Sequence, residues 1–305
     1  MNSEPLRQAI TTPDGRDLEV ISAGPEDGRC LLWHSGTPSS AAISPSSLAA
    51  ATERGLRYVT FSRAGYSTST AKAGRSVGDV TQDVTTILDA LGFDSFLCGG
   101  QSGGGPHALA CAALLPDRVL ATATIAGVAP WPAEGLDWFA GMGPENLVEF
   151  EASMKGPEAL TPLLDGEAAH LRIVQAGEVA AALGGLVSDV DKRALTGAYA
   201  EHMAGSFRRA VSVSTAGWRD DDIAFVHPWG FDIGSIRTPV AIWQGGEDRM
   251  VPMSHGAWLA AHIPGAEQHL LPEEGHLSLA LNRFGDVLDG LLSMADTAPK
   301  AARAS

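Results

Sequence analysis

The chain has 305 residues, of which 45% are hydrophobic and 19% charged, and its formal net charge is −15 at pH 7. This acidity argues against nucleic acid and anionic membrane surfaces as partners. No uninterrupted apolar stretch approaches the length of a membrane span, whereas the apolar content supports a large core in an enzyme-sized α/β protein.

The three cysteines, Cys30, Cys98 and Cys111, lack the C-x-x-C spacing of redox and metal motifs. They lie in apolar runs, so we predict that they are small buried residues without disulfides. The N-terminus also lacks the apolar segment that is typical of a secretory signal. These features predict a protein of the reducing cytoplasm, and they leave its oligomeric state open.

The first half of the chain alternates short apolar runs with helical patterns. This alternation is typical of a mostly parallel, doubly wound sheet with right-handed crossovers. The expected strands are 18–21 at a sheet edge, 30–33, 58–61, the run from 96 into Ser102, and 119–125, and the expected helices are 48–54, 76–91 and 107–115.

Two segments match the pattern G-x-S-x-G, and their surroundings separate them. In residues 74–78, Ser76 is followed by Asp79 and then by apolar residues at helical spacing, so we predict that Ser76 caps the helix 76–91. In residues 100–104, an apolar strand leads into Ser102 and a buried helix follows. Ser102 is therefore predicted to be a nucleophile on a sharp strand-to-helix turn, which its flanking glycines permit.

From residue 129 to residue 235 the pattern is only helical, and Ser188 with Asp191 opens one of these helices. Strands then resume at 239–243 and 268–271, with helices at 258–262 and 276–292. We predict a core formed by residues 1–128 and 236–294, a helical cap at 129–235, and a flexible tail at 295–305.

A serine hydroxyl needs a base, and the base needs an orienting carboxylate, before it attacks a carbonyl at neutral pH. Functional residues of parallel sheets gather at the carboxyl ends of strands, here in the chain order serine, acid, histidine. Asp248 follows the strand 239–243, with Glu247 as the alternative acid. His276 follows the strand 268–271 within a Gly-His pair.

The other eight histidines lack this combination of a strand end and a preceding glycine. They lie in the loop 34–38, behind Ser102, in the insertion, or in unrelated contexts: His34, His107, His170, His202, His227, His255, His262 and His269. A tetrahedral intermediate also needs two backbone N–H donors for its oxyanion. We assign these to Gly103 and Thr37, with Gly36 as the alternative to Thr37.

The chain resembles the α/β-hydrolase superfamily, in the lidded subgroup that includes esterases. The segments that carry the resemblance are 34–38, 62–67, 100–104, 247–252 and 275–276. The resemblance implies the α/β-hydrolase fold with an inserted all-helical cap, a Ser102–His276–Asp248 triad, and an acyl-enzyme intermediate. It implies a small-molecule substrate and no cofactor or metal.

Three functions remain open at this point. The first is hydrolysis of an ester or a related acyl bond. The second uses the same triad for C–C bond hydrolysis, perhydrolysis or lyase chemistry, and the third is ligand binding without catalysis. The insertion carries eight large apolar residues that either contact a hydrophobic substrate or form the cap's own core: Trp131, Trp138, Phe139, Met142, Phe150, Trp218, Phe225 and Trp229.

Overall fold

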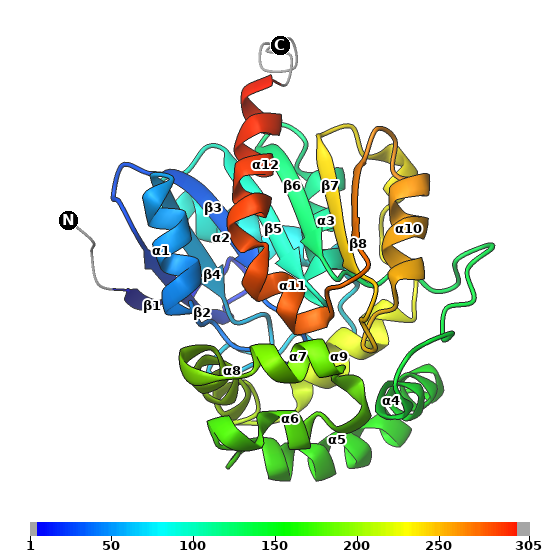
Figure 1. Ribbon diagram of the computed structural model, residues 1–305. Coiled ribbons are helices and arrows are strands. Elements are labelled where there is room, and N and C mark those ends of the chain that lie inside the picture. Colours follow the sequence, from blue (N-terminus) through cyan, green and yellow to red (C-terminus); the bar gives the residue numbers. More distant parts are fainter. Residues whose placement is uncertain (1–4, 298–305) are drawn as a thin grey trace.

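An eight-stranded sheet forms the centre of the computed structural model, which describes residues 5–297 (Figure 1). The strand order is β1-β2-β4-β3-β5-β6-β7-β8. The pairs β1–β2 and β2–β4 are antiparallel and all later pairs are parallel, as the alternating pattern predicts. The strands are β1 (Leu6–Thr11), β2 (Asp17–Ala23), β3 (Arg29–His34), β4 (Leu56–Phe61), β5 (Phe96–Gln101), β6 (Val119–Ile125), β7 (Val240–Gly245) and β8 (Glu267–Leu271).

Helices cover both faces of this sheet, and each face has its own apolar core. Helices α2, α3 and α10 pack on one face, and α1, α11 and α12 pack on the other. The bounds of these helices are α1 (Pro45–Glu53), α2 (Val80–Leu91), α3 (Gly104–Leu114), α10 (Met253–His262), α11 (His276–Asn282) and α12 (Phe284–Thr297). Because the central strands are buried on both faces, they read as continuous apolar runs in the sequence.

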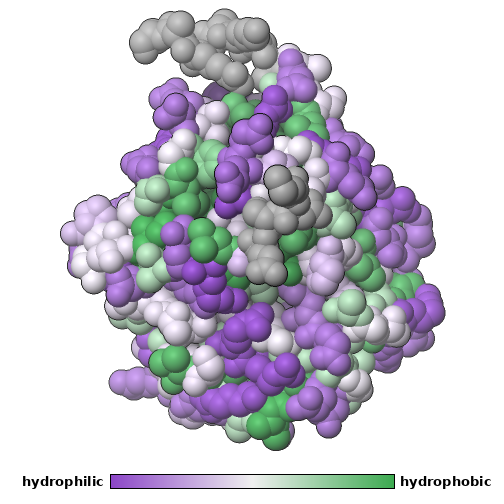
Figure 2. Space-filling model, turned by 90° about the vertical axis from the view of Figure 1, so that its left-hand side faces the viewer, coloured by the Kyte–Doolittle hydropathy of each residue, from purple (hydrophilic) through white to green (hydrophobic). Residues whose placement is uncertain are grey.

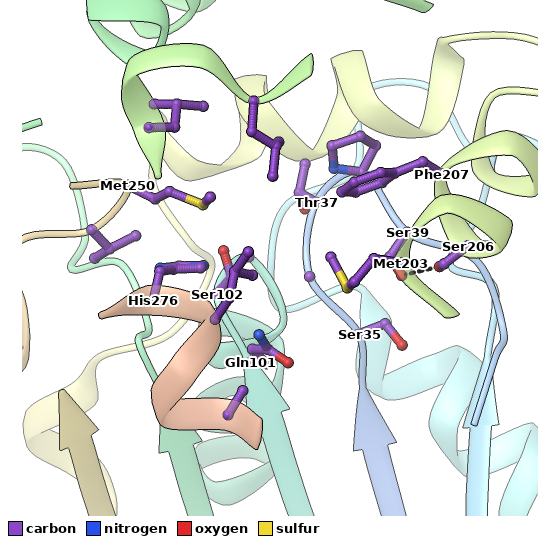
Figure 3. A pocket seen from close by; sticks show the side chains of 18 of the residues that line it. Ser35, Thr37, Ser39, Gln101, Ser102, Met203, Ser206, Phe207, Met250 and His276 are labelled. Atoms are coloured by element: carbon purple, nitrogen blue, oxygen red, sulfur yellow. Dashed lines mark hydrogen bonds between the residues drawn. The ribbon is translucent and has the colours of Figure 1, made fainter. Parts of the chain in front are cut away.

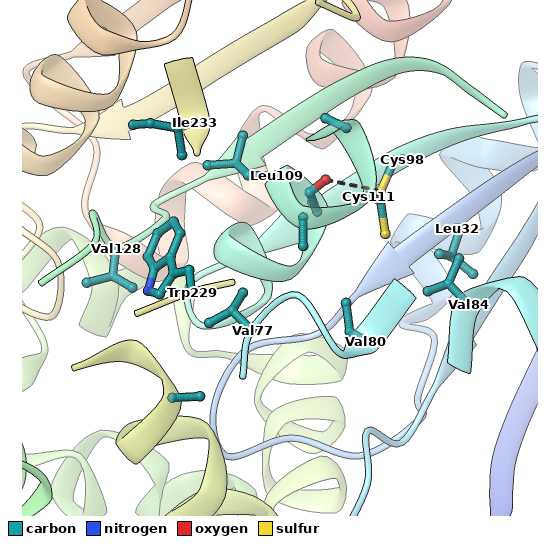
Figure 4. Close-up of a cluster of buried hydrophobic side chains, with 14 of the residues drawn as sticks. Leu32, Val77, Val80, Val84, Cys98, Leu109, Cys111, Val128, Trp229 and Ile233 are labelled. Carbon is teal, nitrogen blue, oxygen red and sulfur yellow. Dashed lines mark hydrogen bonds between the residues drawn. The ribbon is translucent and has the colours of Figure 1, made fainter. Parts of the chain in front are cut away.

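Figure 4 shows part of the core on the α2 and α3 face, where Leu32 and Val84 pack together and Trp229 lies near Val77. Cys98 on β5 and Cys111 on α3 lie close together in this cluster. All three cysteines are buried and free, so this prediction is confirmed.

Between β6 and β7 every described element is a helix, in agreement with the predicted pattern. We call residues 129–235 the cap, a division that we propose. The cap helices lie together at one end of the sheet (Figure 1) and bury their own apolar cluster, to which α5, α8 and α9 contribute. They are α4 (Pro144–Lys155), α5 (Pro157–Leu171), α6 (Val179–Ala182), α7 (Asp189–Ala194), α8 (Gly197–Ala210) and α9 (Ala216–Phe225), with short 3₁₀ turns at Ala176–Glu178, Gly184–Leu186 and Ile233–Ser235.

The edge of the sheet differs from the prediction. The segment expected at the edge is β2, which lies between β1 and β4, and the edge strand is β1. Ile10 is the one buried residue of β1, so this strand lacks the apolar alternation that would reveal it.

Two helix boundaries also differ. Helix α2 begins at Val80, because the Asp79 carboxylate accepts hydrogen bonds from the backbone N–H and the hydroxyl of Ser76 and closes a turn before the helix. The prediction that Ser76 is the N-cap residue of this helix is therefore wrong. The last predicted helix is two helices, α11 and α12, separated at Arg283.

The C-terminal helix α12 reaches Thr297, so it includes the first three residues of the predicted tail, 295–305. Residues 298–305 lie outside the described part of the chain. Figure 2 shows hydrophilic residues spread over the face that carries the N-terminal strands, with small hydrophobic groups between them. Within residues 5–297, no helix combines the length and the hydropathy needed to cross a membrane.

Candidate active site

Ser102 lies at the turn between β5 and α3, and its backbone has a positive φ of 53°. An L-residue rarely adopts this conformation, and its strain is typical of functional sites. The flanking glycines permit close backbone approach: a Cβ on Gly100 would lie 2.2 Å from the carbonyl oxygen of Gly104, and one on Gly104 would lie 2.1 Å from that of His34. The sharp turn predicted at residues 100–104 is therefore present.

His276 and Asp248 are buried together at the ends of neighbouring strands. The Nδ1 atom of His276 lies 2.8 Å from Oδ2 of Asp248, while Oδ1 of Asp248 accepts the backbone N–H groups of Met250 and Val251. Glu247, the alternative acid, is exposed. The structure thus brings His276 to Asp248 and leaves Glu247 outside the pair.

The charge of Asp248 favours the protonated form of the His276 ring. Burial alone would lower the pKa of His276, but the charge and hydrogen bond of Asp248 outweigh it and raise this pKa above the ordinary histidine value. Burial raises the pKa of Asp248, while His276 opposes that shift. Asp248 can therefore hold the Nδ1 proton and stabilise a positive ring.

Figure 3 shows that the ring of His276 and the hydroxyl of Ser102 point toward one another across the floor of a cavity. Within the described residues, the Ser102 hydroxyl has no hydrogen bond to His276. Contacts of this kind commonly tighten when substrate binds.

The loop after β3 lies beside Ser102. A Cβ on Gly36 would lie 3.4 Å from the Cβ of Ser102, and a Cβ on Gly103 would lie 2.3 Å from the Thr37 hydroxyl. In the part of the chain that the structure describes, the backbone N–H groups of Gly36, Thr37 and Gly103 have no acceptor. These groups can serve an oxyanion, and the choice between Thr37 and Gly36 stays open.

A network of ion pairs and hydrogen bonds supports the loop of residues 35–37. The Arg63 guanidinium donates to the carbonyl oxygens of Ser35 and Gly36, and to the Thr37 hydroxyl at 2.9 Å. Arg63 in turn pairs with Asp221 of α9, whose carboxylate also accepts the Thr37 hydroxyl at 2.8 Å.

Asp221 is fully buried and ionised. Arg75 lies 2.6 Å from its carboxylate, and Tyr66 donates to it at 2.9 Å. Burial opposes ionisation, yet the charges of Arg63 and Arg75 hold the pKa of Asp221 well below its usual range. Asp221 gives no signal in the sequence, because Arg63, Tyr66 and Arg75 lie in the loop after β4, some 150 residues earlier in the chain.

A second cap carboxylate, Asp191 of α7, reaches the other side of the site. It accepts the backbone N–H groups of His276, Leu277 and Ser278, which open helix α11, at 2.8–3.1 Å. The predicted capping of α7 by Ser188 is present, since Ser188 accepts the N–H of Asp191. The added contact to His276 is a tertiary one that local pattern cannot reveal.

A cavity of about 460 Å³ separates the strand ends from the cap and includes Ser102 and His276 in its wall. Met203 and Phe207 of α8 and Met250 lie around it (Figure 3). Of the eight large apolar residues singled out in the cap, Phe150, Trp218 and Phe225 line the cavity. The other five do not line it, and they pack in or against the core on the α2 and α3 face of the sheet rather than in the cap's own cluster: Trp131, Trp138, Phe139, Met142 and Trp229.

The described residues include one group with the chemistry of a metal site. The ligand atoms of His34, Cys98 and Cys111 lie within 4.8 Å of one another, with Cys111 Sγ 3.5 Å from His34 Nε2. All three are buried in the core behind the turn, where they do not line the cavity. The predicted absence of a metal and of a cofactor stays a prediction.

His107, predicted to lie behind Ser102, is fully buried and bonds through Nδ1 to the carbonyl oxygen of Gly103. Burial and the charge of Arg63 lower the pKa of His107 to about 3, so its ring is neutral beside Asp221. His107 does not line the cavity, which agrees with the prediction that its side chain points away from the reacting group. His202 is the other histidine besides His276 that lines the cavity.

Comparison with known proteins agrees with this architecture. The family model described as the alpha/beta hydrolase fold matches residues 30–282. A protein of Variovorax paradoxus named as a putative carbamate hydrolase, RutD, is 26% identical over 255 residues, which cover 83% of this chain and 86% of that protein.

Solved structures resemble the chain over almost its whole length. An enol-lactonase from Burkholderia xenovorans superposes with a TM-score of 0.68 at 17% identity, covering 94% of this chain and all of the other. An esterase from Exiguobacterium antarcticum gives a TM-score of 0.66 at 17% identity, covering 96% of this chain and all of the other. These likenesses concern the fold.

Proposed function

Because the chain belongs to the alpha/beta hydrolase fold family, we propose that it is a serine hydrolase acting on a small ester or related acyl substrate. One observation carries this proposal. Ser102, strained at φ 53°, faces the His276–Asp248 pair across the floor of the cavity. Strain, an oriented base and a substrate-sized cavity are the elements that nucleophilic catalysis needs.

In this mechanism the Ser102 hydroxyl attacks the acyl carbon while His276 Nε2 takes its proton. Asp248 holds the opposite ring nitrogen in its protonated form and stabilises the positive imidazole. The N–H groups of Gly103 and Thr37 receive the developing oxyanion. His276 then protonates the leaving group, and a water activated by the same ring hydrolyses the acyl-enzyme.

The cavity wall favours a partly hydrophobic substrate. Phe150, Phe207 and Phe225 contribute rings, and Met203 and Met250 contribute adaptable thioethers. These surfaces support an acyl or alcohol group of moderate size near Ser102.

A carbamate is the second candidate substrate, because the relative from Variovorax paradoxus is named as a putative carbamate hydrolase. A carbamate presents the same carbonyl carbon to Ser102 and the same oxygen to Gly103 and Thr37. Its resonance makes that carbon less electrophilic, so the same groups would act on a slower reaction.

The chain offers a matched control for the test, since Ser76 is the serine of the second G-x-S-x-G segment. Wild type, Ser102→Ala and Ser76→Ala are treated with a fluorophosphonate probe and assayed on p-nitrophenyl esters of graded chain length and on a phenyl carbamate. We expect labelling of wild type and Ser76→Ala only, and a fall in kcat of about 10⁴-fold or more in Ser102→Ala. Equal labelling of Ser102→Ala would overturn the nucleophile, whereas labelling without ester turnover would favour C–C hydrolysis, perhydrolysis or lyase chemistry.

A further inference from the structure

The cavity has an acidic wall. Four carboxylates of the cap line it, and none of the described residues that line it is Lys or Arg. Glu145 and Glu167 are exposed, whereas Glu149 and Asp222 lie deeper. An anionic substrate would meet repulsion along this wall, and a cation would be drawn into it.

Asp222 belongs to the face of α9 that looks into the cavity. Trp218, Asp222 and Phe225 recur at helical spacing, and all three line the cavity. Phe225 covers the proposed oxyanion site, since its Cζ would lie 3.0 Å from a Cβ on Gly103. Asp222 lies about 5 Å, roughly one helical turn, from Phe225 along α9.

The carboxyl of Asp222 is buried and incompletely satisfied. The residue is 1% exposed, and within the described residues its Oδ2 atom has no hydrogen-bond donor. The Glu149 carboxyl lies against it and accepts the indole N–H of Trp218 at 2.8 Å. An ionised carboxylate is only an acceptor, so neither group can satisfy the other unless a proton lies between them.

The two nearby guanidinium groups, Arg63 and Arg75, face Asp221, and the charge of Glu167 also acts on Glu149. Ionised Asp222 and Glu149 would therefore have no cation of their own. Burial and the charge of Glu149 raise the pKa of Asp222 well above its usual range, and burial raises that of Glu149. Both shifts favour the protonated carboxyl, and a proton shared between the two groups would satisfy them when no ligand is present.

We propose that Glu149 and Asp222 form a subsite for a primary or secondary ammonium group, so that the preferred substrate is an acyl compound with a positively charged amine. The ammonium would donate to the half-buried Glu149 and take the place of the proton shared with the buried Asp222, and that proton would leave to solvent. The rings of Trp218 and Phe225, on the same face of α9, would add cation–π attraction. The inference rests on the proposed function only in treating this cavity as the substrate site.

The test measures binding rather than turnover. Ser102→Ala protein is titrated calorimetrically with butylammonium and hexylammonium, and with butanol and hexanol as neutral counterparts of the same length. We expect the ammonium ions to bind about tenfold or more tightly than the alcohols, as charge-assisted hydrogen bonds allow. This preference should be lost in Asp222→Asn and in Glu149→Gln, both in the Ser102→Ala background.

Glu151→Gln is the matched control, because Glu151 is an exposed carboxylate on the same helix as Glu149 and does not line the cavity. Equal affinity for ammonium and alcohol would overturn the subsite, as would a preference that survives in both variants or falls equally in Glu151→Gln. Glu149→Gln keeps an acceptor for Trp218, so it tests the idea even if Asp222→Asn does not fold. Failure of Ser102 labelling with the preference intact would refute the proposed chemistry and leave the subsite standing.

Discussion

Asp191 and Asp221 both extend from the cap to a loop of the proposed active site, but the protein compensates their buried charges differently. Asp191 accepts three consecutive backbone N–H groups at the start of α11. Asp221 lies between two guanidinium groups and supports the loop of Thr37. One carboxylate is thus held by a helix terminus and the other by ion pairs.

The cap takes part in the proposed chemistry through both of these carboxylates. Asp191 acts on the side of the base, since the first N–H that it accepts belongs to His276. Asp221 acts on the side of the oxyanion, since it bonds to Thr37 and to the arginine that supports the loop. Removing one member of a buried ion pair leaves an unpaired buried charge. Replacing Asp221 should therefore mainly lower stability, whereas replacing Asp191 should mainly lower activity.

The largest effect is expected from Asp221→Asn. This change leaves Arg63 and Arg75 buried without their shared counter-ion, which should lower the free energy of unfolding by about 3–5 kcal/mol. Urea unfolding measures the loss.

Asp289→Asn is the control for that prediction, because Asp289 pairs with Arg54 at the surface and is 61% exposed. It should lose less than about 1 kcal/mol. Equal losses in the two variants would show that the Arg63–Asp221 network is not stabilised by its charges, and the proposed contrast with Asp191 would fall.

The next effect is expected from Asp191→Ala, which removes the acceptor for three backbone donors. We expect kcat to fall about tenfold to a hundredfold, because His276 loses its fixed orientation toward Ser102. The cost in unfolding free energy should be about 1–3 kcal/mol. Steady-state kinetics and urea unfolding separate these two losses.

Asp189→Ala is the matched control, since Asp189 lies in the same helix α7 and its side chain is 86% exposed. Its kcat should equal that of wild type. If Asp191→Ala changes KM or stability but leaves kcat unchanged, the positioning role of Asp191 is contradicted.

The sequence predicts the parts of the site that follow strands. Ser102, Asp248 and His276 each come directly after a strand or its short loop, so the general geometry of parallel sheets indicates where they meet. The same reasoning predicts the parallel strands, because buried strands read as apolar runs. It misses β1, whose residues are mostly exposed and carry no alternation.

The sequence does not predict Asp191 or Asp221 as parts of the site. Their partners are 85 to 184 residues away in the chain, and the contacts arise from packing of the cap on the core. The presence of Asp191 is also explained locally, because Asp191 pairs with Ser188 at the N-terminus of helix α7. A residue with a satisfactory local role gives no signal of a second, tertiary one.

A smaller effect concerns pH. The proposed reaction needs a neutral His276, so activity should be lost below the pKa of this ring, and Asp248 raises that pKa against the opposing effect of burial. The acid limb of kcat/KM should therefore lie above the ordinary histidine value of about 6.5. The charge of Asp191 also raises the pKa of His276, so Asp191→Asn should move the limb to lower pH. An unchanged limb in pH–rate profiles would show that Asp191 acts through geometry alone.

The smallest effect is expected from Ser188→Ala. Ser188 accepts the backbone N–H of Asp191 and donates its hydroxyl to Oδ2 of the same residue at 3.1 Å, so its loss should cost about 0.5–1 kcal/mol of stability. Oδ2 of Asp191 still accepts the N–H of His276, and Oδ1 still accepts those of Leu277 and Ser278, so kcat should stay within about twofold of wild type. If kcat instead falls as far as in Asp191→Ala, then the placement of helix α7, rather than the Asp191 carboxylate, positions His276. The position of His276 would then depend on packing, whereas that of the Thr37 loop depends on the charge of Asp221.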